Sequence, residues 1–317
     1  MRFLMLGAGG IGAYYGARLV SAGHDVVFVA RGEHLTAMHE NGLSIRHPDF
    51  SFEQRVQVVD QIVLADDYTV EDFDLVVLTM KSGATDEVMA SLHNWLDDSS
   101  VPVLSLQNGV DNEYLIESRV GRERTVGGLA VRIGGHITEP GVIEATGQAQ
   151  IVMGAWKNAL QNPTLHQRLY PIVKQFCEAE IPTTLSDEIQ KELWRKLLIN
   201  NGVNPLSALT CCDTRALTSD PVLTRTVYQL MQEAAAAAIA DGVLLDQSDV
   251  EEMYQLICQF DPIKTSMLVD LEKHRPLELD AISGAVILRM RKQDQVAPLT
   301  ELIQALLSKR IETLAQQ

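Results

Sequence analysis

The chain has 317 residues, of which 26 are basic and 42 acidic, so its net charge at pH 7 is −16. This charge argues against nucleic acid or an anionic membrane surface as a partner, because both require basic patches. A small anion remains a candidate ligand, since its binding depends on local charge. No apolar run approaches the roughly 20 residues that cross a bilayer. A hydrophobic fraction of 46% in a chain of this length predicts two domains with cores of their own.

The N-terminal stretch MRFLMLGAGG is too short an apolar run for a secretory signal. The 4 cysteines form neither a C-x-x-C pair nor a metal-ligand spacing with histidine. This cysteine usage is typical of a reducing cytoplasm, so we expect a cytoplasmic protein without a metal site. Adjacent Cys211 and Cys212 are either a redox pair or, as we favour, buried or incidental thiols.

The first half of the chain alternates short apolar runs with helical stretches. Continuous apolar runs are typical of strands that are buried on both faces. The predicted strands are residues 3–7, 24–31, 73–81 and 101–109, and the predicted helices are residues 11–22 and 84–96, with another after residue 109. This β-α-β order predicts an α/β fold with a doubly wound parallel sheet.

The pattern changes after residue 124. Glycine and β-branched residues in 124–154 predict an antiparallel edge to the sheet, whereas residues 45–55 carry no clear signal. A helix is expected at 163–179. Beyond residue 186 no strand is evident, and the predicted helices are residues 187–204, 221–240, 248–260 and 279–292. We therefore place the boundary near residue 186, which gives domains 1–186 and 187–317.

A glycine-rich loop follows the first predicted strand and opens the first predicted helix. Its residues Gly7, Ala8, Gly9, Gly10, Ile11 and Gly12 form a G-x-G-x-x-G pattern. Between a strand and a helix, such glycines allow a tight turn and a close backbone approach to a pyrophosphate, and the helix N-terminus supplies donors. The loop therefore predicts a dinucleotide site rather than a glycine turn without a ligand.

The choice of dinucleotide depends on the end of the second strand. An NAD site usually has an acidic residue there, about 20 residues after the glycine loop, to bind the ribose 2′-hydroxyl. Here the strand ends at Arg31, which suits a 2′-phosphate and favours NADP over NAD, although Glu33 lies close by. Lys81, at the end of another strand, either reaches the cofactor edge or is a plain strand-end lysine.

A polar stripe interrupts the apolar stretch WRKLLINNGVNP at 194–205. Lys196, Asn200 and Asn204 are spaced four apart, so on a helix they form one slowly drifting line. Partial burial would lower the pKa of the lysine and make it a better acid, and the amides can orient a hydroxyl, carbonyl or carboxylate. The residues alone fit a solvated helix face equally well. Pro205 has no N–H, so we expect the helix to kink or end there.

Four segments of the chain together resemble one family. WRKLLINNGVNPLSAL (194–209) closely resembles the signature of ketopantoate reductases, and SMLVDLEKHRPLELDAISG (266–284) is similar to a second segment of that family. Gln107-Asn108-Gly109 and the glycine loop extend the match over essentially the whole chain. The resemblance implies a Rossmann-type domain that binds NADP, an all-helical C-terminal domain like that of 6-phosphogluconate dehydrogenase, and an active cleft between them.

The resemblance also implies a role for each matching residue. Lys196 would be the general acid that protonates a carbonyl oxygen, and Glu278 would be the second catalytic carboxylate. The residues that would bind the substrate are Asn108, Lys196, Asn200, Asn204 and Ser266. The residues that would hold NADP are Gly7, Ala8, Gly9, Gly10, Ile11, Gly12, Arg31, Lys81, Asn108 and Ala130.

Three of these residues have simpler interpretations. Glu278 follows Pro276 and precedes an apolar stretch, so it fits a cap at the start of a helix. Ser266 fits a cap or turn, and Asn108 in Asn-Gly fits a turn. We favour the functional role in each case, and we assign Asp280 a structural one.

The resemblance implies reduction of 2-dehydropantoate (ketopantoate) to pantoate with NADPH, on the route to pantothenate and coenzyme A. The partner is then a small 2-oxo acid, and the alanine-rich run at 234–238 suits a homodimer interface as well as a core. One alternative is a paralogous reductase of another 2-oxo acid or sugar, because the loop at 210–214 does not align with the family. The other is a module that senses NADP without turnover.

Overall fold

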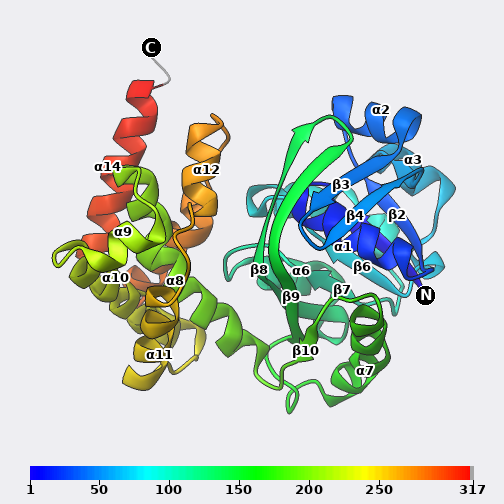
Figure 1. Ribbon diagram of the computed structural model, residues 1–317. Helices are drawn as coiled ribbons and strands as arrows, with labels where there is room; N and C mark the ends of the chain where they lie inside the picture. The colour runs from blue at the N-terminus through cyan, green and yellow to red at the C-terminus, as the bar shows by residue number, and fades with distance from the viewer. Residues whose placement is uncertain (315–317) are drawn as a thin grey trace. The chain divides into compact units, whose positions relative to one another are not determined.

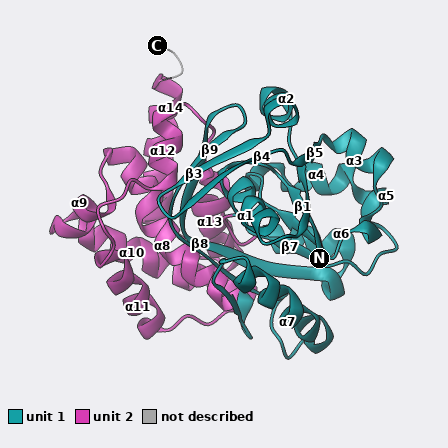
Figure 2. Ribbon diagram, turned by 45° about the vertical axis from the view of Figure 1, so that its right-hand side comes forward, with its two compact units in different colours: residues 1–107, 112–189 teal, residues 108–111, 190–317 magenta. Residues whose placement is uncertain are grey.

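The computed structural model describes residues 1–314 and divides into two compact units (Figure 2). Unit 1 consists of residues 1–107 and 112–189, and unit 2 consists of residues 108–111 and the chain from Gln190 onward. The main division lies close to the boundary predicted at residue 186. The domain assignment itself stays a prediction, because contiguous domains do not account for the short segment 108–111.

Unit 1 is built on one ten-stranded sheet, counted over the residues that the structure describes. Its strands run in the order β4-β3-β9-β8-β7-β6-β1-β2-β5, with β10 paired to β9. The strands are β1 (Arg2–Leu6), β2 (Asp25–Val29), β3 (Leu43–His47), β4 (Phe50–Gln54), β5 (Gln57–Val59), β6 (Leu75–Leu78), β7 (Val103–Ser105), β8 (Thr125–Glu139), β9 (Val142–Ala155) and β10 (Thr183–Leu185).

Six neighbouring strands of the sheet are parallel to one another, as the β-α-β order predicts. In the order in which they lie in the sheet, they are β5, β2, β1, β6, β7 and β8. Strand β1 lies inside this parallel part and explains why its sequence is a continuous apolar run. Phe3 and Met5 join the core on one face of the sheet, whereas Leu4 and Leu6 join the core on the other. Both faces are therefore covered, and the predicted doubly wound sheet is confirmed.

Helices α1 (Gly10–Ser21), α2 (Gly32–Asn41) and α7 (Pro163–Glu178) contribute to the first of these cores. The second core is formed with α3 (Gln61–Asp67), α4 (Thr85–Ser91), α5 (His93–Leu96) and α6 (Asn112–Val120). Short 3-10 turns are η1 (Val70–Asp72), η2 (Ser82–Ala84) and η3 (Arg122–Arg124). The helix predicted at 84–96 is divided, because Leu92 has a non-helical ψ of 10° between α4 and α5.

The long hairpin β8–β9 is antiparallel, as predicted, but it is not the edge of the sheet (Figure 1). Strand β9 also pairs with β3, and β3 pairs with β4, which is the last strand on that side. Strands β3 and β4, which include most of the stretch 45–55 that carries no clear sequence signal, therefore complete the sheet. Only Leu43, Ile45 and Phe52 are buried in this pair, so its apolar pattern is too sparse to predict.

Unit 2 is helical, and no strand occurs between residues 190 and 314. Its helices are α8 (Ile189–Thr210), α9 (Thr214–Ser219), α10 (Leu223–Ala238), α11 (Gln247–Cys258), α12 (Ser266–Glu272), α13 (Ala285–Lys292) and α14 (Pro298–Leu314). A 3-10 turn, η4 (Ile239–Asp241), follows α10, and a π-type turn, η5 (Asp280–Gly284), precedes α13. The predicted helical composition is confirmed, although α9, α12 and α14 were not predicted.

The sequence predicts a kink or an end of the helix at Pro205, and the end is wrong because helix α8 continues through this proline to Thr210. The proline removes one helical hydrogen bond, but its neighbours from 201 to 208 are all buried, and packing outweighs the local preference. The far end of the helix is also stabilised. The guanidinium of Arg310 donates to the carbonyl of Ala208 at 3.0 Å and to that of Leu209, which would otherwise lack partners.

None of the described helices combines the length and apolar composition that crossing a bilayer requires.

Gly16 of α1 should tolerate no side chain. A methyl group there would lie 2.3 Å from Cε1 of Phe28, whose ring is 0% exposed and cannot swing aside. We expect Gly16→Ala to lower the free energy of unfolding by about 1–3 kcal/mol, although alanine is the better helix former. Urea denaturation measures this. Gly83→Ala is the matched control, because nothing lies within 4 Å of its added methyl group, and equal effects of the two variants would contradict the prediction.

Candidate functional site

The glycine loop joins β1 to α1, and each glycine meets a different constraint. Gly7 has a φ of +112°, and a methyl group on it would lie 2.7 Å from the backbone nitrogen of Met80. A methyl group on Gly12 would lie 2.1 Å from the carbonyl oxygen of Gly7. Gly9 differs, because a methyl group there would meet nothing within 4 Å. The loop is therefore tightly packed at Gly7 and Gly12 and open at Gly9, where a pyrophosphate can approach.

The peptide groups of the loop are held from behind. Gly7 and Ala8 both donate their N–H groups to the carbonyl of Val29, at 3.2 and 3.0 Å. The hydroxyl of Thr79 donates to the carbonyl of Gly7 at 2.6 Å. Helix α1 then begins after Gly9, which has no side chain to cap it. The first N–H groups of α1 are thus available to an anion, as in other phosphate-binding loops.

The other predicted cofactor residues lie at the same end of the sheet. Arg31 follows β2, is exposed, and makes no ion pair with any residue in the described range. Lys81 follows β6 directly after Met80, which adjoins the glycine loop. Ala130 is half-buried in β8, which runs parallel to β7 and continues beyond the carboxyl end of that strand. Residues from four strands therefore gather where dinucleotides bind in this class of sheet.

In unit 2 the structure brings Asn108 and Glu278 together. The side-chain amide of Asn108 donates to Oε2 of Glu278 at 3.0 Å. Next to it, a methyl group on Gly109, whose φ is +101°, would lie 3.0 Å from the carbonyl oxygen of Ala281. Segment 108–111 thus runs close against the chain that includes η5. Turns of the π type are often found at functional sites.

Arg289 of α13 anchors this segment. Its guanidinium bonds Asp111 and Asp241, each at 2.7 Å, and it lies 5.3 Å from the centre of the Trp194 ring. The side chain is only 2% exposed. Burial acts to lower the pKa of Arg289, but the hydrogen bond and charge of Asp111, with those of Asp241, more than offset it, so the pKa is raised. The charge of Arg289 is therefore stably held, and through Asp111 it fixes the chain beside Asn108.

Lys196, Asn200 and Asn204 lie on α8, as predicted. Lys196 and Asn200 are half-buried, so this line of side chains is not a fully solvated face. Asn204 is only 5% exposed, so it is the most buried of the three residues. A side-chain amide can both donate and accept, so Asn204 is suited to bind a polar ligand.

Ser266 does not cap α12, whereas Glu278 lies directly before a helical stretch, where its backbone carbonyl accepts from the N–H of Ile282. Ser266 is the exposed first residue of α12, and the capping oxygen comes instead from Thr265, which accepts from the N–H of Leu268. The carboxylate of Glu278 accepts from the side-chain amide of Asn108. Asp280, assigned a structural role, is exposed.

The sequence motifs assign no role to several residues around these side chains, although Gln107 itself belongs to one of the matching segments. Gln107 is 4% exposed and donates to the carbonyl of Met80 and to the hydroxyl of Thr85, at 3.0 and 2.8 Å. It thereby fixes the chain just before Asn108. Asp111 and Arg289 hold the same chain just after it. The only sequence signal for Arg289 is its place among the apolar residues of a helix, which is weak evidence for burial.

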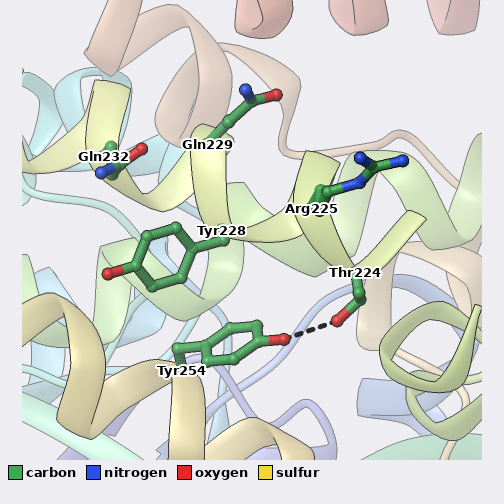
Figure 3. A pocket seen from close by; sticks show the side chains of 6 residues that line it. All are labelled: Thr224, Arg225, Tyr228, Gln229, Gln232 and Tyr254. Carbon is green, nitrogen blue, oxygen red and sulfur yellow. Dashed lines mark hydrogen bonds between the residues drawn. The ribbon is translucent and has the colours of Figure 1, made fainter. Parts of the chain in front are cut away.

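A groove on unit 2 contains none of the predicted site residues (Figure 3). It has a volume of about 300 Å³ and is lined by Thr224, Arg225, Tyr228, Gln229, Gln232 and Tyr254. The hydroxyls of Thr224 and Tyr254 bond each other at 2.6 Å, and the two tyrosine rings meet edge to face. These polar atoms already have partners.

No group of three metal-ligating side chains occurs in residues 1–314. The cysteines are all free thiols. Cys211 is exposed and Cys212 is half-buried, so of the favoured interpretation, buried or incidental thiols, burial is wrong and incidental thiols stay a prediction. Cys211 ends up at the surface because it follows the last turn of α8, where its Sγ lies 2.9 Å from Arg310.

Comparison with known proteins gives one family for both units. The family model described as ketopantoate reductase PanE/ApbA matches residues 3–158, and the one described as ketopantoate reductase PanE/ApbA C terminal matches residues 188–311. The 2-dehydropantoate 2-reductase of Pyrococcus abyssi is 28% identical over 310 residues, which cover 97% of each chain. These matches confirm the resemblance found in the sequence motifs.

Solved structures show the same fold. The 2-dehydropantoate 2-reductase from Geobacter metallireducens has a TM-score of 0.87 at 27% identity and covers 98% of this chain and 100% of its own. D-mandelate dehydrogenase, solved with NADH and anilino(oxo)acetate, has a TM-score of 0.90 at 22% identity over 99% of each chain. The predicted architecture, a Rossmann-type sheet with a helical C-terminal part, is thus confirmed.

Loss of the buried cation should destabilise the protein strongly. We expect Arg289→Leu to lower the free energy of unfolding by about 3–5 kcal/mol, because it leaves the carboxylate of Asp241, 9% exposed, without its partner. Arg291→Leu on the same helix is the control. Its side chain is 67% exposed and pairs with Glu301 at the surface, so the change should stay within about 0.5 kcal/mol. Denaturant unfolding compares the two, and similar losses would contradict the prediction.

Proposed function

Since this chain belongs to the ketopantoate reductase family of oxidoreductases, we propose that it reduces 2-dehydropantoate to pantoate with NADPH, on the route to pantothenate and coenzyme A. The observation that carries this proposal is the hydrogen bond of 3.0 Å between Asn108 and Glu278. It links a residue just beyond a Rossmann strand to the carboxylate that the sequence motif marks as catalytic.

The glycine loop fits a pyridine dinucleotide, since it is open at Gly9 and leaves the first N–H groups of α1 available. When bound, the nicotinamide supplies a hydride to the 2-oxo carbon. Arg31 favours NADPH, because its exposed guanidinium lies after β2, where the adenosine ribose is bound in this fold. A guanidinium forms charge-assisted and often bidentate hydrogen bonds with a phosphate, whereas a neutral hydroxyl accepts only a weaker bond.

Lys196 supplies the proton in the proposed reaction. Its ammonium donates one proton to the carbonyl oxygen as the carbonyl carbon gains the hydride, so the ketone becomes a secondary alcohol. The amine that remains then recovers a proton from solvent. A lysine that is half-buried on α8 is suited to this task, because general acids work best when they lose a proton readily near neutral pH.

The amides orient the substrate. Asn200 and Asn204 present donors and acceptors to its hydroxyl and carboxylate groups, and their spacing of four residues on α8 beside Lys196 supports such contacts. Ser266 adds an exposed hydroxyl. The bond from Asn108 to Glu278 fixes which way the Asn108 amide faces, because a carboxylate accepts only from the NH₂ end.

The first test follows NADPH oxidation with ketopantoate. Wild type should turn over, and Lys196→Ala should lose about 10²–10⁴-fold in kcat, the usual contribution of a general acid, while still binding NADPH. Lys191→Ala on the same helix is the control, because Lys191 pairs with Asp249 at 3.0 Å and has no proposed catalytic role. A panel of other 2-oxo acids and sugars runs in parallel. Turnover of one of them alone, or NADPH binding without any turnover, would contradict the proposed substrate.

The second test concerns the cofactor. We expect Arg31→Ala to raise KM for NADPH roughly 10- to 100-fold, because a hydrogen bond to a charged group contributes about 1.5–3 kcal/mol, and to leave KM for NADH unchanged. Arg46→Ala, an exposed arginine of β3, serves as the control for loss of a positive charge. Equal effects of Arg31→Ala on both dinucleotides would overturn the assignment of Arg31 to the 2′-phosphate.

A further inference from the structure

His34 connects three parts of unit 1 that are far apart in the sequence. It lies in the first turn of α2 and is half-buried. Its Nε2 lies 2.8 Å from the carbonyl oxygen of Ala8 in the glycine loop. Its Nδ1 lies 3.0 Å from the backbone nitrogen of Gly141, at the turn between β8 and β9. This histidine belongs to none of the motifs described above and has no role in the proposed reaction.

The two contacts determine the protonation of the ring. Gly141 provides a backbone N–H, which can only donate, so Nδ1 must be the unprotonated acceptor. The Ala8 carbonyl can only accept, so Nε2 must carry the proton. Burial lowers the pKa of His34, and the bond to Ala8 offsets this only in part. The neutral form with the proton on Nε2 is therefore favoured and satisfies both contacts.

The bond to Ala8 also sets the direction of the next N–H group. The carbonyl of Ala8 and the N–H of Gly9 belong to one peptide unit, which is planar and trans, so the two groups point in opposite directions. With the carbonyl turned towards His34, the Gly9 N–H points away from it. Gly9 is the position where the loop has open space. A peptide turned the other way would direct a carbonyl dipole at a bound phosphate.

The same hairpin supports the loop at a second point. A methyl group on Gly10 would lie 2.0 Å from the carbonyl carbon of Gly135 in β8, so the two backbones are in direct contact. His34 reaches the end of this hairpin at Gly141. The peptide units on either side of Gly9 are thus restrained, one by a histidine and the other by close packing.

We propose that His34 is a positioning residue for dinucleotide binding, which orients the Ala8–Gly9 peptide so that its N–H group meets the pyrophosphate. The inference rests on the proposed function only in requiring that a pyridine dinucleotide binds this loop. It differs from the proposed role of Arg31, because the pyrophosphate is common to NADPH and NADH whereas the 2′-phosphate is not.

The test measures binding of NADPH and NADH to the full chain by the change in dinucleotide fluorescence. We expect His34→Ala to raise Kd about tenfold for both dinucleotides, the loss typical of one hydrogen bond. His34→Gln keeps an N–H donor at the end of its side chain, so it should restore most of the affinity. In turnover, His34→Ala should raise KM for NADPH and leave kcat nearly unchanged. His39→Ala, an exposed histidine of the same helix, is the control and should bind as wild type does.

Three results would overturn the inference. The first is wild-type affinity in His34→Ala. The second is equal loss in His34→Ala and His34→Gln with a lowered melting temperature in both, which indicates a purely structural role. The third is a loss confined to NADPH, which would assign His34 to the 2′-phosphate. Failure of wild type to bind either dinucleotide is a separate outcome, because it overturns the proposed function together with this inference.

Discussion

The pairing of Arg289 with Asp111 is the constraint on which the arrangement of the candidate catalytic residues depends. A guanidinium that is 2% exposed must be compensated, and the two carboxylates of Asp111 and Asp241 do this. Asp111 belongs to the chain that follows β7, so its bond to α13 brings segment 108–111 into unit 2. Asn108 reaches Glu278 within the same segment. The buried guanidinium of Arg289 thus holds segment 108–111, which follows strand β7, within the helical unit.

Much of the fold could be predicted because its signals are local. The apolar run of β1 indicated a strand buried on both faces, and the glycine loop after it indicated a dinucleotide site. Strands β3 and β4 could not be found in this way. They bury only a few residues, and what makes them strands is pairing with β9, about a hundred residues away in the chain. The end of the helix predicted at Pro205 is wrong for a related reason, because contacts with distant residues outweigh the local preference of the proline. The residues around it are buried, and Arg310 bonds the carbonyl of Ala208 beyond it.

The sequence indicates which residues are candidates for the site, but it does not indicate which of them are in contact. The spacing of Lys196, Asn200 and Asn204 indicates one helix face whether or not anything binds there. Nothing local indicates that Asn108 meets Glu278, because 170 positions separate them. Contacts between close neighbours in the chain are also hard to predict, as the N-terminus of α12 shows. Thr265 and Ser266 are adjacent hydroxyl residues, and only the backbone direction decides that the first caps α12 and leaves the second exposed.

The excursion of residues 108–111 gives the chain three covalent connections between the units in place of one. A gene cut at residue 189 therefore does not encode two self-sufficient proteins. The first fragment would carry Asp111 and Asn108 without the groups that they bind. The second would enclose the guanidinium of Arg289 with Asp241 alone. Independent inheritance or exchange of the two halves is thus disfavoured, because either half would need a new partner for the charge that it loses.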